Sequence, residues 1–486
     1  MSRVPDRFDS ATKFGAALLA PEETAVAQAG ESVAVLAFAT GSADPAADIL
    51  GEGVPDEIIN ALARVPGLRV IARTSSFRFK GSGASIAEIG AALKVRTVLE
   101  GRVSQGAGRV HVTARLVNAA DEQPLWAEDY KRATGDLIAI QVEIARAIAA
   151  RLQVGLEGGV GRVPEAPHSS NSDAHHLYLK GRYHWARREL KDAHACFARA
   201  LALDPDYALA HAGLADACTL LAQYGLAAPA RVLPDARQAV RRALELAPDL
   251  AEAHCAAGTI ALVFDWNWAA AESELRLAIE LNSRYDTARY WLAFYLTFIQ
   301  ARFDEALDQA KRAVDLDPLA ALPTAQLGLT LIGAARYDEA LTVLRRATEL
   351  NPRLFLPRTF LGVLAHRLER TDEAIESLQT ALELSGRHPW PLASLAVCFA
   401  SQGRRKEVKS IHQELVARAG LQYVQSAMLG VVTAALGNME GAFSLLGRAC
   451  DERDGILIYS KRYPAFAALQ TDPRMRRIYE RVGITA

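Results

Sequence analysis

The residues best suited to chemistry are histidines near the middle of the chain. Six of them lie between positions 175 and 254: His175, His176, His184, His194, His211 and His254. Imidazole is a common metal ligand, but a zinc site needs three or four converging ligands with a supporting shell of hydrogen bonds. These histidines fall on different faces of different predicted helices. We therefore expect packing and surface roles for them, and no metal site.

Short glycine pairs are the next candidates, because glycine-rich loops cradle phosphates. Gly51-Glu52-Gly53 and Gly81-Ser82-Gly83 lack the Lys-Ser/Thr of a phosphate loop and the spacing of a dinucleotide fingerprint. Both are interpreted as turns. The sequence has no GxSxG or HExxH motif. We expect no catalytic residues and no cofactor, so the chain is predicted not to be an enzyme.

Aromatic and basic residues at helical spacing favour binding rather than catalysis. They are predicted to line one concave surface: Tyr178, Arg182, Trp185, Trp291, Tyr295, Phe298, Thr359 and His366. Buried aromatic anchors in such a groove are typical of peptide or helix recognition. The alternative is that Trp291, Tyr295 and Phe298 simply pack against the next helix. No direct contact with nucleic acid is predicted.

These residues are positioned by a repeat. Small residues recur at spacings of 43, 35, 35, 34, 34, 34 and 34: Ala193, Ala236, Ala271, Ala306, Ala340, Ala374, Val408 and Ala442. A period near 34 is typical of the tetratricopeptide repeat, a pair of antiparallel helices. We predict eight pairs over residues 173–453. The resemblance implies an all-α solenoid, a right-handed superhelix with a concave channel.

Some repeats depart from the regular length of 34 residues or from the usual small residue. Repeat two carries about nine extra residues between its helices, and repeats three and four are each one residue longer than 34. Most first helices carry a small residue where the second helix must approach, such as Gly328 and Gly362. Phe294 replaces it in repeat four and predicts a locally wider contact. The preferred binding surface is therefore expected around repeats three to six.

Residues 31–155 have a different period. Val33–Phe38 is an apolar run that predicts a buried strand, and alternating segments around Gln105–Gly108 predict a hairpin. Ser85 and Glu88 form a potential capping box. The predicted order is β-α-β-α-β-β-β-α, a small α+β domain.

The run from VAVLAFATG to RTSSFRFKG, followed by GAALKVRTVLEG to WAEDYKR, resembles a domain related to the amino-terminal domain of the Tol-system propeller protein. In bacteria that domain commonly precedes tetratricopeptide repeats and often follows an effector such as a nucleotide cyclase, a kinase or a winged-helix domain. The preceding residues 1–30 cannot hold such an effector. We therefore expect the effector to be a separate polypeptide.

Composition restricts the remaining possibilities. Lys plus Arg total 55 against 56 for Asp plus Glu, so no overall field favours nucleic acid or an anionic membrane. Five scattered cysteines without a CxxC pair predict buried thiols in a reducing compartment. With no spanning or signal segment, the protein is predicted to be cytoplasmic. Residues 1–30 are expected to be a flexible lead-in, 156–172 a linker and 454–486 a cap.

The predicted function is a non-catalytic adaptor that binds a protein partner in bacterial signalling or transcriptional regulation. One alternative is a sensor in which residues 31–155 bind a small ligand or nucleotide and act on a separate cyclase, kinase or regulator. Another alternative is an envelope-associated assembly factor. A homo-oligomer is compatible with each of these.

Overall fold

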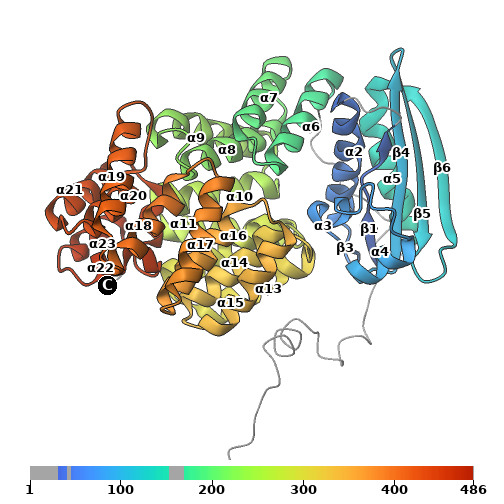
Figure 1. The fold of residues 1–486 in the computed structure, drawn as a ribbon. Coiled ribbons are helices and arrows are strands. Elements are labelled where there is room, and N and C mark those ends of the chain that lie inside the picture. Colours follow the sequence, from blue (N-terminus) through green and yellow to red (C-terminus); the bar gives the residue numbers. More distant parts are fainter. Residues whose placement is uncertain (1–30, 41–44, 153–168, 485–486) are drawn as a thin grey trace, which may run out of the picture.

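The computed structural model describes residues 31–40, 45–152 and 169–484 (Figure 1). The predicted lead-in at 1–30 and most of the predicted linker lie outside these residues. The described chain forms a sheet-containing domain beside a long array of helices, as the change of hydrophobic period near residue 155 predicts. Among the described residues, no helix is both long and apolar enough to cross a membrane.

The first domain is built on one mixed sheet with the order β3-β1-β4-β5-β6, with β2 beside β4. Its strands are β1 (Ser32–Val35), β2 (Ala39–Thr40), β3 (Arg69–Val70), β4 (Thr97–Gly106), β5 (Arg109–Asn118) and β6 (Pro124–Ala133). β1 runs parallel to β3 and β4, whereas β4, β5 and β6 form an antiparallel meander. The predicted hairpin is confirmed. Ala107 and Gly108 make its turn, both with positive φ as a two-residue turn of this kind requires.

Helices cover both faces of this sheet. They are α2 (Pro45–Ala63), α3 (Arg73–Phe77), α4 (Ile86–Leu93) and α5 (Leu137–Arg151). Side chains of α2 and α5 join one face in a core that includes Ile58 and Ile144, and α4 covers the other face through Ile89 and Leu93. The predicted capping box at Ser85 is present. The short helix α3 was not predicted.

The glycines of the Gly51-Glu52-Gly53 stretch are not in a turn, which corrects the sequence interpretation. Both lie inside α2. A Cβ on Gly51 would meet the Phe38 carbonyl oxygen at 2.8 Å, and one on Gly53 would meet Leu179 at 3.1 Å. The two glycines therefore let α2 approach the sheet on one side and the first repeat helix on the other. Gly81 does lie in a turn and Gly83 follows it, both with positive φ.

The described array consists of eight successive helix pairs. The first helices are α6 (Ser172–Ala186), α8 (Ala208–Gln223), α10 (Ala251–Ile260), α12 (Asp286–Tyr295), α14 (Ala321–Gly333), α16 (Phe355–Arg367), α18 (Pro389–Ser401) and α20 (Ser426–Ala435). The second helices are α7 (Leu190–Leu203), α9 (Pro229–Leu246), α11 (Trp268–Leu281), α13 (Phe303–Leu316), α15 (Tyr337–Leu350), α17 (Thr371–Leu384), α19 (Arg405–Ala419) and α21 (Met439–Asp451).

In most pairs a small residue lets the two helices approach closely, as predicted. A Cβ on Gly328 would lie 2.6 Å from Leu344, and one on Gly362 would lie 2.6 Å from Leu378. In repeat four the large and small residues change helices. Phe294 lies on α12 at the position of the glycine, and Ala310 lies on α13 at the position of the leucine. Both residues are fully buried. The large residue is accommodated by a small one on its partner helix.

The extra residue of repeats three and four lies in a π turn. η3 (Ala261–Asp265) continues α10, and η4 (Leu296–Gln300) continues α12. A π turn holds one more residue than an α turn without breaking the helix. The two 35-residue spacings in the sequence therefore correspond to a local change from α-helix to π-helix.

The extra residues of repeat two are mostly helical rather than a long loop, which also differs from the prediction. They lengthen α8 to Gln223 and start α9 early, at Pro229. The end of α8 reaches repeats seven and eight. His388 Nε2 lies 2.8 Å from the Tyr224 carbonyl oxygen, and the Gln425 amide donates to the Gln223 carbonyl at 3.2 Å.

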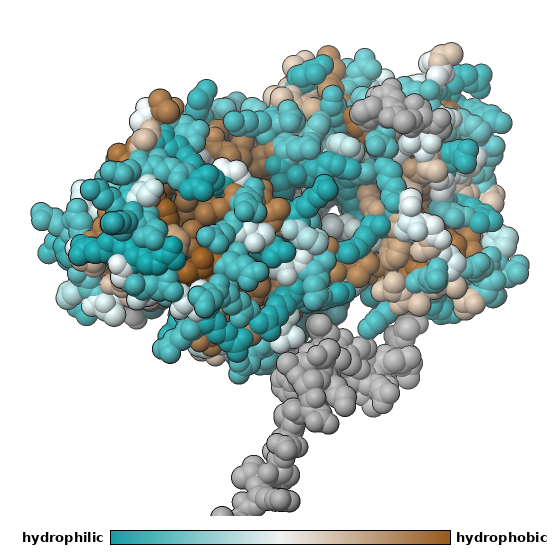
Figure 2. All heavy atoms as spheres, viewed as in Figure 1, coloured by the Kyte–Doolittle hydropathy of each residue, from teal (hydrophilic) through white to brown (hydrophobic). Residues whose placement is uncertain are grey.

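After α21 the chain turns back into the array. This C-terminal segment (residues 455–484) contains η5 (Gly455–Tyr459), η6 (Pro464–Phe466), α22 (Ala467–Gln470) and α23 (Met475–Val482). η5 contacts η3, η4, α8 and α20, and η6 contacts α16 and α18. α23 packs on α21, as a cap would. Figure 2 shows apolar side chains gathered over the middle of the array, with hydrophilic ones around them.

Candidate functional site at the inner face of the array

The predicted aromatic groove is filled by the chain itself. Trp291, Tyr295 and Phe298 are 7%, 1% and 0% exposed. The Phe298 ring lies 5.3 Å from the ring of Tyr459, which comes from η5. The open groove expected at these residues is therefore absent, because all three side chains are buried and the C-terminal segment packs against Phe298. The packing alternative describes these three residues.

Two tyrosines hold the C-terminal segment in the array. The Tyr459 ring lies 4.8 Å from Phe294 and 5.0 Å from Trp390, and the Tyr463 ring lies 5.9 Å from Trp390. Between them, Arg462 donates to the Phe298 carbonyl oxygen at 2.8 Å. The C-terminal segment thus contacts residues of both repeat four and repeat seven, although it is distant from repeat four in sequence.

The predicted residues of repeat six do not join a common surface. Thr359 is buried, and its hydroxyl donates to the Phe355 carbonyl oxygen at 3.0 Å inside its own helix. His366 is half-buried, and burial lowers the pKa of its imidazole. Neither side chain contacts the aromatic residues of repeat one.

The predicted residues of repeat one lie at the junction with the sheet domain. Tyr178 is buried, whereas Arg182 and Trp185 are half-buried. Arg182 donates to Asp56 of α2 at 3.4 Å, and its guanidinium lies 5.7 Å from the Trp185 ring. Arg182 therefore binds the chain's own α2, and Tyr178 belongs to the core that includes α2.

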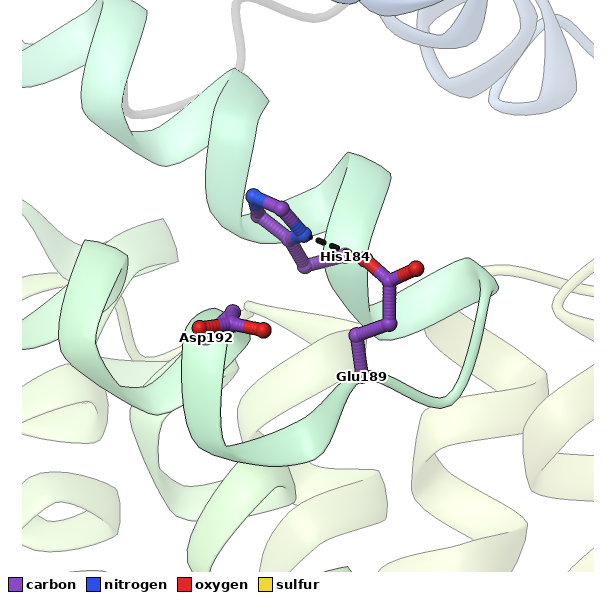
Figure 3. Close-up of side chains that lie close together, drawn as sticks. All are labelled: His184, Glu189 and Asp192. Atoms are coloured by element: carbon purple, nitrogen blue, oxygen red, sulfur yellow. Dashed lines mark hydrogen bonds and ion pairs between the residues drawn. The ribbon is translucent and has the colours of Figure 1, made fainter.

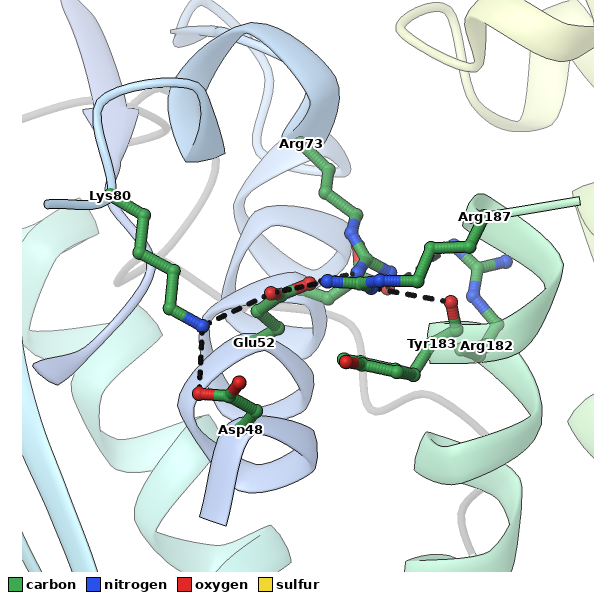
Figure 4. Close-up of polar contacts among 8 residues, drawn as sticks. Asp48, Glu52, Arg73, Lys80, Arg182, Tyr183 and Arg187 are labelled. Atoms are coloured by element: carbon green, nitrogen blue, oxygen red, sulfur yellow. Dashed lines mark hydrogen bonds and ion pairs between the residues drawn. The ribbon is translucent and has the colours of Figure 1, made fainter. Parts of the chain in front are cut away.

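A charged network around Glu52 joins the two parts of the protein (Figure 4). Arg73 and Lys80 of the sheet domain donate to its carboxylate at 2.7 and 3.2 Å, and Arg187 of the array donates at 2.8 Å. Arg187 also lies 3.5 Å above the Tyr183 ring. Burial alone would raise the pKa of Glu52, but the hydrogen bond from Arg187 and the positive charges of Arg73, Arg187 and Lys80 lower it to about 2.

A second junction with the sheet domain lies on repeats four and five. The backbone N–H and the hydroxyl of Ser75 both donate to Asp317 Oδ1, at 2.7 and 2.5 Å, and the Ser75 hydroxyl oxygen accepts from the Leu319 N–H at 2.7 Å. Arg78 donates to the Leu350 carbonyl oxygen at 2.7 Å. The helix α3, which the sequence did not reveal, supplies Ser75.

The junction has a testable pH dependence. Burial, followed by the charge of Asp286, raises the pKa of Asp317 from 3.8 to about 7. The folded protein therefore holds this proton to a higher pH than the unfolded chain, and the free energy of unfolding falls as the pH rises from about 4 to about 7. We expect Asp317→Asn to flatten this part of a plot of melting temperature against pH.

The exposed Asp308 is the control for this measurement. Asp308→Asn removes a carboxylate from the outer surface of the same helix pair, and its profile should follow the wild type. A steep fall between pH 4 and 7 that persists in Asp317→Asn would assign the effect to other groups.

Three carboxyls from successive first helices form what we call the inner acidic cluster: Asp216 of α8, Glu252 of α10 and Asp286 of α12. Burial raises the pKa of Asp216 to about 7, against the charges of Arg182 and Arg188, although part of its surface stays accessible. Among the described residues, Asp216 has no hydrogen-bond or ion-pair partner, and Glu252 Oε2 has no hydrogen-bond partner. Glu252 Oε1 lies 3.5 Å from Arg64.

Donors beside this cluster also remain unsatisfied within the described chain. Trp185 Nε1, Arg182 Nε and Arg188 Nη1 are buried atoms without a hydrogen-bond partner there. Arg188 lies 4.8 Å above the Trp185 ring. Buried polar atoms are normally hydrogen-bonded. Their concentration makes the inner face of repeats one to four the candidate binding site.

Three side chains with metal-binding atoms, His184, Glu189 and Asp192, meet at the turn between α6 and α7 (Figure 3). One ligand atom each from His184, Glu189 and Asp192 lies within 4.8 Å of the others. His184 Nδ1 and Glu189 Oε2 are 2.6 Å apart, and both carboxylates are exposed. The hydrogen bond between His184 and Glu189 accounts for this arrangement and closes the turn.

The described cysteines are buried free thiols, as predicted: Cys196, Cys218, Cys255, Cys398 and Cys450. Burial raises the pKa of each, to about 12 for Cys218 and Cys398. A thiol held in its protonated form is a poor nucleophile. They serve as small core residues.

Comparison with known families identifies two of the helix pairs. The tetratricopeptide repeat family matches residues 325–354 and 358–388, which cover most of α14 to α17. The chain carries tetratricopeptide repeats. The other helix pairs of this tetratricopeptide-repeat array follow the same small-residue series.

Individual proteins resemble parts of the chain. A curated protein of Rhizobium meliloti (strain 1021), named "Putative adenylate cyclase 3", is 36% identical over 186 residues, which are 38% of this chain and 32% of that protein. The chain thus spans about a third of the length of this relative.

Two solved structures share the helical arrangement in part. The Cut9 and Hcn1 hetero-tetramer of the APC/C is 14% identical, with a TM-score of 0.44, over 70% of this chain and 59% of that chain. A thermophilic tetratricopeptide-repeat protein of Thermus thermophilus is 24% identical, with a TM-score of 0.32, over 35% of this chain and 90% of that chain.

Proposed function

We propose that the protein is a scaffold in bacterial signalling or transcriptional regulation, which binds a protein partner through its tetratricopeptide-repeat array. The repeats support the binding role, since arrays of this kind bind protein and peptide partners. The likeness to a protein named an adenylate cyclase supports the signalling setting, and it fits the resemblance of residues 31–155 to domains that accompany such effectors.

The observation that carries the proposal is the unsatisfied inner acidic cluster. Asp216 and Glu252 Oε2 stand on a partly buried surface without hydrogen-bond partners from the described chain. A lysine or arginine side chain of a partner would supply both charge and donors. Hydrogen bonds to charged groups contribute about 1.5–3 kcal/mol. This surface therefore favours a segment that presents a basic side chain.

Matched variants test this proposal. Asp216→Asn with Glu252→Gln removes two carboxyl groups from the inner cluster, whereas Asp235→Asn with Asp372→Asn removes two exposed carboxyl groups from second helices. We expect a cross-linked partner to be recovered with the wild type and the exposed variant, and at least tenfold weaker binding with the inner variant. Binding should also weaken as salt increases.

Two outcomes would contradict it. One is that no reproducible partner is recovered with any of the three proteins. The other is a partner that binds the inner variant and the wild type equally, which would place the contact on another surface of the array. Circular dichroism of each variant must match the wild type, because Glu252 also contacts Arg64.

A further inference from the structure

The strand β6 has a free edge. It lies at one end of the sheet, paired with β5 on one side, and no described strand pairs with its other side. Figure 1 shows it on the side of the domain that faces away from the repeat array. In an antiparallel strand, every second residue directs its N–H and C=O outward. A strand of ten residues therefore offers a row of donors and acceptors to an incoming strand.

The centre of β6 has an ordered charge pattern. Glu128 and Asp129 precede Tyr130, and Lys131 and Arg132 follow it. The four charged side chains are exposed or half-buried, whereas Tyr130 is 5% exposed and holds the strand against the core. The strand therefore carries two negative charges on one side of Tyr130 and two positive charges on the other side.

This pattern is complementary to itself. When two copies of β6 run antiparallel with their sheets continuous, opposed residues share a face, so one residue lies opposite its own copy at the centre. With Tyr130 at the centre, Asp129 lies opposite Lys131 of the second copy, and Glu128 lies opposite Arg132 of the second copy. Each contact occurs twice, which gives four pairs of opposite charge.

Neighbouring registers lose this match. Centring on Asp129 opposes that carboxylate to its own copy, and centring on Lys131 opposes two ammonium groups. Charged residues on an edge strand usually deter pairing with other strands. Here their order deters mismatched strands and favours one register of self-pairing.

We propose that β6 pairs with β6 of a second copy of this chain, to form a dimer with one continuous sheet. Existing contacts are compatible with this arrangement. Arg132 is held by Glu143 at 2.8 Å on the helix side, and Asp129 lies 2.7 Å from His111 and 3.8 Å from Lys131 on the open side. In the dimer, the contact between Asp129 and Lys131 within one copy is replaced by a contact between Asp129 of one copy and Lys131 of the other.

The expected dimer is reversible and sensitive to salt. Cross-strand pairs of opposite charge contribute only about 0.2–1 kcal/mol each, and exposed pairs are screened at high ionic strength. The edge hydrogen bonds supply the rest of the contact. Dimerisation through this edge leaves the repeat array of both copies free to bind partners.

Charge reversal tests the proposal in the full chain. Glu128→Lys with Asp129→Lys places bases against bases, and Lys131→Glu with Arg132→Glu places acids against acids. By sedimentation velocity at low salt, we expect the wild type to dimerise and each variant to show at least a tenfold higher dissociation constant. A mixture of the two variants should restore a dimer, because each edge then meets its opposite.

Two controls separate this mechanism from general charge effects. Asp129→Lys with Lys131→Asp exchanges the two residues and keeps every opposed pair complementary, so it should dimerise like the wild type. Glu376→Lys with Glu383→Lys adds the same charge to an exposed helix of the array and should also have no effect. A wild type that stays monomeric at low salt, or reversed variants that still dimerise alone, would overturn the proposal.

Discussion

Replacing Tyr459 with alanine is expected to lower the free energy of unfolding by about 3–5 kcal/mol, the usual cost of deleting a buried aromatic ring. The ring lies among Phe294, Phe298, Trp390 and Tyr463, and the residue is 4% exposed. Its removal leaves a cavity that several repeats line. Urea unfolding followed by circular dichroism measures this change.

The matched control is Tyr459→Phe. It keeps the ring and removes only the hydroxyl, which lies 3.5 Å from the Gln223 amide nitrogen. Its effect should stay below about 1 kcal/mol, since the net contribution of one such hydrogen bond is small. Leu421→Ala, at a residue 90% exposed, should stay within about 0.5 kcal/mol. If Tyr459→Ala matched these controls, the C-terminal segment would not be part of the core.

Replacing Glu52 with glutamine is expected to cost about 3 kcal/mol of the free energy of unfolding at neutral pH. The carboxylate pairs with Arg73 and Arg187, so the variant leaves guanidinium groups without their counter-charge. The same magnitude follows from its pKa, which falls from 4.5 to about 2 in the folded protein, at about 1.4 kcal/mol per unit.

The pH dependence identifies the cause. A lowered carboxyl pKa stabilises the folded state above pH about 4.5, and this contribution is lost as the pH falls from about 4.5 to about 2. The wild type and Glu52→Gln should therefore converge in stability in acid. Asp48→Asn, which removes a half-exposed partner of Lys80, should cost less than about 1 kcal/mol. A constant difference between wild type and Glu52→Gln at every pH would exclude the ionised carboxylate as the cause.

Both predictions concern contacts between parts of the chain that are distant in sequence. Tyr459 joins the C-terminal segment to repeats four and seven, and Glu52 joins α2 to the first repeat. The C-terminal segment consequently packs inside the tetratricopeptide-repeat array, against repeats four and seven, and the sheet domain packs on the first repeat. The surface that we propose for a partner is therefore the inner face around Asp216.

The sequence by itself determined the local structure. A period near 34, the small residues opposite Leu344 and Leu378, the capping box at Ser85 and the hairpin at Ala107 depend on residues close together in the chain. Even the π turns are visible as spacings of 35. Helix pairs and hairpins are encoded by local patterning, which is why these elements could be predicted.

Only the tertiary structure decided which surface is free. Phe298 carries the pattern of an exposed groove, yet Tyr459 packs against it from more than 150 positions away. Glu52, inside a glycine-flanked stretch interpreted as a turn, meets Arg187 of the array. An apolar or charged side chain can pack against residues that are distant in the chain. Such a long-range contact produces no repeating pattern in the sequence, so it cannot be predicted from the spacing of residues. The candidate binding site therefore depended on the structure, whereas the repeats did not.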